Sequence, residues 1–312
     1  MSSRIQQLDF LKCVCIVLMV MFHLVFIGDK FPYAKSVVYT FHMPVFLLLS
    51  GFLVHTQRPA RQFFRSQWWI FVPYLIMELP YVVLSGFLGV RGADAELSVP
   101  LLLYRVFADP LGPYWYLHTL LICNITLWGV QWLFQRQGWL LRLFVYAVVL
   151  VLLVYGTGLV AQNVLYYFLG VVIAQAGAGF FSIFHPSFLS LLLGVLLCCF
   201  PGNLHYATPG GMLITYFAIN FMLWVYNHCT TKILVPILYV GRNTLVVLLF
   251  SPIFTMLVKP LVPVLSFDPT GLIFLTVATS FSVLGSFAVA WVMDRLRLSR
   301  WFCGRREILL HL

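Results

Sequence analysis

Charged residues are scarce in this sequence. Only 9% of its 312 residues are charged, whereas 62% are hydrophobic and 17% are aromatic. A soluble domain has about 25% charged residues and is about half apolar, so water is not the main solvent of this chain. About ten membrane helices of roughly 20 residues leave only short loops, which excludes an independent soluble domain.

Motifs built from cysteine or from paired histidines are also missing. The sequence has no CxxC pair, and most of its seven cysteines lie inside apolar runs, where we interpret them as packing residues. It has no HxxxH or HxH spacing, so we predict no metal site. It also lacks a GxSxG elbow, which gives no support to a covalent acyl-enzyme. We expect no permanently bound cofactor.

The formal net charge of +10 does not indicate a nucleic-acid protein. Basic residues that bind nucleic acid are expected to form a patch or stripe, whereas here they lie in the breaks between apolar runs. Lys and Arg concentrate in cytoplasmic loops of membrane proteins. The charge therefore predicts topology, with the N- and C-termini both in the cytoplasm.

Ten apolar runs of helical length predict an all-α, polytopic membrane protein that forms a single domain over residues 1–312. Lys232 to Gly241 is expected to be an interfacial turn or a short helix. The predicted helices lie near residues 8–28, 36–55, 67–89, 114–134, 140–156, 159–176, 187–201, 212–228, 243–260 and 271–293.

Three histidines are predicted to reach one level of the outer leaflet. Lys12 and His23 are eleven residues apart, roughly 20° past three helical turns, so they share one face about 16 Å apart. His42 and His118 lie near the outer ends of two other predicted helices. Ionisable groups inside a membrane are functional candidates. The alternatives are interhelical hydrogen bonds for the histidines and snorkelling to the interface for Lys12.

Arginines form a second candidate site. Arg58, Arg61 and Arg65 are three and four residues apart, a spacing that places them on one helical face. They are either a topology anchor or a phosphate clamp, because guanidinium groups match phosphate oxygens. Arg242 is a further phosphate candidate. Glu78 is the one acid deep in a predicted span, where it either pairs with a base or stays protonated.

Several segments, taken in order, carry a family resemblance. They include LDFLKCVCIVLMVMFH (residues 8–23), FHMPVFLLLSGF (41–52), PYWYLHTLL (113–121) and VGRNTLVVLL (240–249). The set resembles the acyltransferase 3 family of membrane O-acyltransferases, in particular its sugar O-acetylase-like branch without an appended esterase-like domain. The family's first helix has a basic residue and an essential histidine separated by ten residues. Lys12 takes the basic position, where arginine is usual.

The resemblance implies a cytoplasmic acyl-CoA donor, with acetyl the expected acyl group, and a glycan or lipid-linked sugar whose hydroxyl approaches from the outer side of a bacterial inner membrane. Membrane lipids are the other expected partners. The resemblance implies that Lys12 and His23 are functional, and His23 is suited to be the general base. Together with the depth and charge arguments above, the predicted catalytic residues are His23, His42 and His118, the predicted acyl-CoA-binding residues are Lys12, Arg58, Arg61, Arg65 and Arg242, and the predicted acceptor-binding residues are Trp115, Tyr116 and Glu78.

Two alternatives from other functional classes stay open. Buried polar groups also mark translocation routes, so the chain could be a transporter or flippase for a lipid-linked sugar. Transporters often have two related halves with broken helices, and the sequence has no visible repeat. The other alternative is a non-catalytic subunit of a polysaccharide assembly complex.

Overall fold

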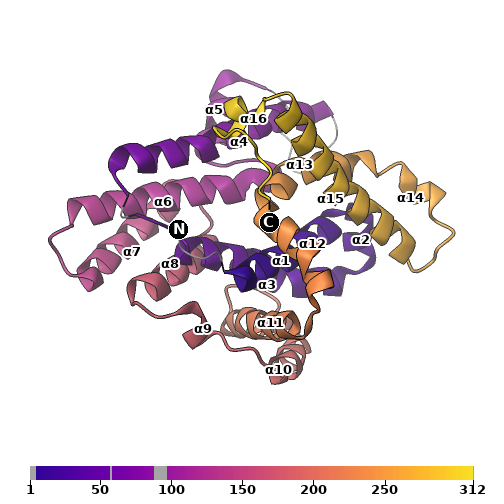
Figure 1. Cartoon of the computed structure of the whole chain (residues 1–312), viewed down its shortest axis with the longest axis horizontal. Helices are drawn as coiled ribbons and strands as arrows, with labels where there is room; N and C mark the ends of the chain where they lie inside the picture. Colours follow the sequence, from indigo (N-terminus) through magenta and orange to yellow (C-terminus); the bar gives the residue numbers. More distant parts are fainter. Residues whose placement is uncertain (1–4, 57, 88–96, 312) are drawn as a thin grey trace. The chain divides into compact units, whose positions relative to one another are not determined.

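The computed structural model describes residues 5–56, 58–87 and 97–311, and these residues form helices and loops without a β-strand. The helices along the chain are shown in Figure 1. Their bounds are α1 (Gln6–His23), α2 (Val25–Lys30), α3 (Pro32–Phe52), α4 (Ala60–Phe87), α5 (Val99–Phe107), α6 (Trp115–Leu133), α7 (Trp139–Gly156), α8 (Ala161–Gln175), α9 (Phe180–Ile183), α10 (Leu189–Cys198), α11 (Pro209–His228), α12 (Thr231–Arg242), α13 (Thr244–Leu257), α14 (Leu261–Val264), α15 (Leu272–Arg295) and α16 (Ser299–Cys303), with 3-10 turns at Gly112–Tyr114 and Pro201–Asn203.

Among the described residues, six helices are long and apolar enough to cross a membrane. They are α1, α3, α4, α7, α11 and α15, and the bent pair α12–α13 would make a seventh. Helices satisfy their own backbone hydrogen bonds, as the bilayer interior requires. The predicted all-α polytopic membrane class is confirmed, while the count of ten spans stays a prediction. Residues 88 and 89, the predicted end of the third helix, lie outside the described residues.

The described chain divides into two compact units. The first unit comprises residues 1–49, 178–297 and 307–312, and the second comprises residues 50–177 and 298–306. The boundary falls within α3, after Leu49. Each unit is described below by itself.

In the first unit α1 is the central helix. It contacts α2, α11, α12, α13 and α15, while α13 also packs along α15 and α10 along α11. The approach of α12 to α1 depends on Gly241, because a Cβ atom there would lie 1.9 Å from the backbone oxygen of Asp9. Glycine allows two backbones to approach this closely.

Two helix ends in this unit shape the candidate site. The run predicted as one helix over residues 8–28 breaks at Leu24, whose extended backbone separates α1 from α2. The break leaves carbonyl groups at the end of α1 without helical partners, and the Tyr39 hydroxyl donates to that of Phe22 at 3.3 Å. A second break at Asn243 turns α13 by 80° relative to α12.

In the second unit α6 is the central helix, in contact with α4, α7 and α8. Its buried Asn124 donates to Gln67 of α4 at 3.1 Å and accepts a hydrogen bond from the Tyr167 hydroxyl of α8. Gly51 packs against the Tyr167 backbone so closely that a Cβ atom would lie 2.0 Å from its oxygen. Buried polar groups need such partners, so the amide network fixes these three helices together.

Candidate functional site

A histidine pair lies at the end of α1 and in α3. His23 is the last residue of α1 and its side chain is exposed, whereas His42 is buried. The Tyr39 ring packs against both imidazoles, with its centroid 6.0 Å from that of His23 and 5.0 Å from that of His42. The structure therefore brings two of the predicted catalytic residues to one place.

The hydrogen bonds of this pair define which ring nitrogen can accept a proton. His23 Nδ1 lies 2.7 Å from the Met19 oxygen, and His42 Nδ1 lies 2.8 Å from the Val38 oxygen. A carbonyl oxygen only accepts, so each Nδ1 carries a proton and donates it. In a neutral imidazole the lone pair is then on Nε2. His42 Nε2 is buried and has no hydrogen-bond partner among the described residues.

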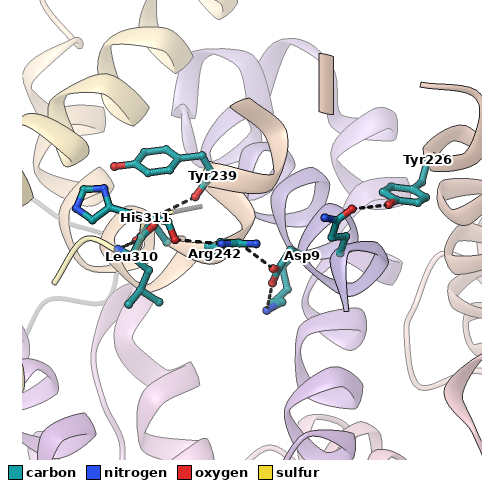
Figure 2. Close-up of polar contacts among 9 residues, drawn as sticks. Asp9, Tyr226, Tyr239, Arg242, Leu310 and His311 are labelled. Carbon is teal, nitrogen blue, oxygen red and sulfur yellow. Dashed lines mark hydrogen bonds and ion pairs between the residues drawn. The ribbon is translucent and has the colours of Figure 1, made fainter. Parts of the chain in front are cut away.

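Lys12, the other residue of the predicted first-helix pattern, belongs to an ion cluster. Its Nζ lies 2.8 Å from one oxygen of the buried Asp9 carboxylate, and Nε of Arg242 lies 3.7 Å from the other oxygen (Figure 2). Lys12 and Arg242 thus share the Asp9 carboxylate, and their side chains are 20% and 16% exposed.

The C-terminal segment closes over this cluster. Arg242 Nη1 donates to the His311 oxygen at 3.0 Å, as Figure 2 shows. Asn243 accepts from the Leu310 amide at 2.7 Å and donates to the Leu310 oxygen at 3.0 Å. The Asp294 carboxylate accepts from the Ile308 and Leu309 amides at 2.7 and 3.2 Å. We call residues 308–311 the C-terminal strap.

The second unit contains the third predicted histidine. His118 is buried and its Nε2 donates to the Phe107 oxygen at 2.9 Å. Because His118 belongs to the second unit and the other two histidines to the first, their common level stays a prediction. Of the predicted sugar-binding residues, Trp115 is half-buried, while Tyr116 is buried with its hydroxyl 2.7 Å from Ser50 Oγ.

Glu78 is fully buried in α4. Its Oε1 accepts from the Leu111 amide at 2.5 Å, and its Oε2 is buried without a hydrogen-bond partner among the described residues. The Arg105 side chain of the same unit pairs with Asp109 at 2.5 Å. Glu78 therefore anchors the turn before α6, and its free oxygen leaves the predicted acceptor-binding role open.

The three clustered arginines are in different surroundings. Arg58 precedes α4 and lines a cavity of about 530 Å³, whereas Arg61 and Arg65 lie in α4 and are exposed. The expectation that all three share one helical face is wrong, because α4 begins only at Ala60. The same cavity is lined by Arg142 of α7, which the sequence does not mark as a site residue.

Sequence reasoning also missed the partners of Arg242. Asp9 is separated from it by most of the chain, so no local spacing indicates that the two charges meet. The signal that was available was the acid within an apolar run. Among the described residues, no group of three His, Cys, Asp or Glu side chains is arranged to hold a metal ion.

Comparison with known proteins identifies the class. Residues 5–291 match the acyltransferase 3 family model, described as an acyltransferase domain, so the chain belongs to that family. The predicted family is thereby confirmed, and with the apolar helices it defines a multi-pass membrane acyltransferase. The comparisons with curated proteins and with solved structures give no match.

Proposed function

We propose that this protein transfers an acyl group, in particular acetyl, from acyl-CoA to a hydroxyl group of a glycan or lipid-linked sugar. The proposal rests on the family and on one observation about the site. His23 and His42 both donate from Nδ1 to a helix carbonyl, which leaves Nε2 of each ring as the proton acceptor. His23 is the exposed one of the two, so it is the base that a substrate can reach.

The chemistry requires a base but no covalent intermediate. Nε2 of His23 removes the proton of the acceptor hydroxyl as its oxygen attacks the thioester carbonyl. The tetrahedral intermediate collapses, the carbon–sulfur bond breaks, and the CoA thiolate takes the proton back from the imidazolium. The products are the O-acyl ester and CoA. The Met19 carbonyl fixes the ring tautomer throughout and stabilises the charged imidazolium.

His42 has a supporting role in this scheme. His42 is buried and its ring packs against Tyr39, which also packs against His23, so His42 is suited to orient the base. The cations Lys12 and Arg242 favour the anionic donor. In the topology predicted from Lys and Arg, that cluster lies toward the cytoplasm and His23 toward the outer face of a bacterial inner membrane.

The test is acyl transfer by the purified protein with a matched histidine control. His228 ends α11 as His23 ends α1, is exposed, and also has Nδ1 within 2.8 Å of a carbonyl one turn earlier. We expect His23→Ala to lower kcat by about 100- to 10,000-fold, the usual contribution of a general base, and His228→Ala to leave it unchanged. The measurement is transfer of radiolabelled acetyl from acetyl-CoA to bacterial lipid-linked and surface glycans.

Two results would count against the proposal. Equal turnover in wild type and His23→Ala would remove His23 from the mechanism. Movement of lipid-linked sugar across proteoliposomes without any consumption of acetyl-CoA would favour the transporter alternative. Both assays use the same preparation of purified protein, so a difference between them does not come from misfolded protein.

A further inference from the structure

The second unit contains a cavity of about 530 Å³ whose walls come from four segments of the chain. The segment after α3, the end of α6, the start of α7 and the end of α8 each contribute. Three helices therefore end here and one begins. Its lining residues are Phe52, Val54, His55, Thr56, Arg58, Leu127, Gln131, Trp139, Arg142, Val171, Ala174 and Gln175.

The charge of this cavity has one sign. Arg58 and Arg142 are its charged residues, and none of the described lining residues is Asp or Glu. Nε of Arg142 is buried and has no hydrogen-bond partner among the described residues. Because no Asp or Glu among the described lining residues balances Arg58 and Arg142, the cavity favours an anionic ligand.

The uncharged residues that line the cavity indicate the other chemical features of the ligand. The Thr56 hydroxyl donates to the side-chain oxygen of Gln131, which orients the Gln131 amide, and the Gln131 NH₂ group can donate to a ligand. His55 Nδ1 donates to the Leu53 oxygen at 2.6 Å. Trp139 and several aliphatic side chains form the apolar part. Guanidinium groups bind phosphate, and an aromatic ring stacks on a flat base. The two together suit a ligand that joins a phosphate to a planar, partly apolar group, as a nucleotide does.

We propose that this cavity binds a phosphate-bearing ligand through the guanidinium groups of Arg58 and Arg142, with the body of the ligand against Trp139. Identifying that ligand as the nucleotide end of the acyl donor rests on the proposed function. The phosphate of an anionic lipid has the same recognition chemistry. Binding of a lipid headgroup depends on the lipid composition of the membrane, and the experiment uses this dependence to distinguish the two ligands.

The experiment measures equilibrium binding of radiolabelled CoA to the full chain in nanodiscs of phosphatidylcholine. Arg142→Gln removes the cation, and Arg136→Gln is the matched control because Arg136 is exposed in the connection just before α7 and does not line the cavity. We expect Kd to rise about 10- to 100-fold for Arg142→Gln and to stay constant for the control. Competition by adenosine 3′,5′-diphosphate but not by pantetheine would locate the phosphate.

A folding defect is separated from a binding defect by two further measurements. Thermal unfolding without ligand should be no lower for Arg142→Gln, because the variant loses an unsatisfied buried group. Arg142→Lys keeps the charge but not the bidentate fork, so its Kd should lie between those of wild type and Arg142→Gln. Equal CoA affinity for the Arg142→Gln and Arg136→Gln variants, in folded protein, would overturn the proposal.

Three arms distinguish the remaining outcomes. If phosphatidylglycerol in the nanodisc displaces CoA from wild type, and Arg142→Gln abolishes that displacement, the phosphate site stands and its ligand is a lipid headgroup. If wild type transfers acetyl while Arg142→Gln has an unchanged KM for acetyl-CoA, the donor assignment fails and the proposed function stands. If CoA binding requires Arg142 but His23→Ala transfers normally, the mechanism fails and the cavity site stands.

Discussion

Gly241 lies where α12 meets α1, and the substitution Gly241→Ala tests the geometry of the ion cluster. A Cβ atom there would be 1.9 Å from the Asp9 oxygen, and contacts below 3.0 Å essentially do not occur. The obstructing atom belongs to a helix backbone, so the two helices must separate by about 1 Å. Overpacking of this kind costs about 1–3 kcal/mol, and the separation also lengthens the contact between Arg242 and Asp9.

The assay is thermal unfolding in detergent, followed by the fluorescence of the nine tryptophans. Gly129→Ala in α6 is the matched control, because no atom lies within 4 Å of a Cβ atom at Gly129. The control should keep or slightly raise Tm, since alanine is the better helix former by about 1 kcal/mol. The Gly241 variant should lose several degrees. The same Tm for the two variants would refute the close approach of α12 to α1.

The remaining predictions concern the same cluster and its strap. Asp9→Asn removes the carboxylate that Lys12 and Arg242 share and should cost up to about 3–5 kcal/mol, less the part that solvent screens at Lys12 and Arg242. Thermal unfolding measures this cost, and Lys12→Met added to Asp9→Asn should restore part of it. Failure of the double variant to recover would show that charge is not the cause. Asn243→Ala removes both side-chain contacts to Leu310, so the amides of the strap should exchange with deuterium faster by about 10-fold or more, while those of α7 should not change. Unchanged exchange in the strap would mean that Asp294 and Arg242 hold it without Asn243.

Composition and apolar periodicity were sufficient for the fold class. They predict membrane helices because a bilayer requires each span to satisfy its own backbone, whatever its neighbours. The short helix expected at residues 232–241 is observed as α12. The break at Leu24 was not predicted, because nothing in an apolar run marks a turn that is stabilised by a hydroxyl from another helix, that of Tyr39.

The part of the candidate site that depends on contacts within one helix was predictable. His23 and His42 each use a carbonyl four residues earlier, so their tautomers follow from local geometry. The cavity was not predictable, because Arg58 and Arg142 meet only after three helix ends converge. The partner of Arg242 was missed for the same reason, since long-range ion pairs leave no mark in the spacing of residues.

The charge cluster has a consequence for how the protein is made. Asp9 and Lys12 are one helical turn apart, so α1 can neutralise its own charges and enter the bilayer before any other helix exists. Arg242 and the strap reach the cluster only after most of the chain has been synthesised. Insertion of α1 and completion of its charge environment are therefore separate events in biogenesis.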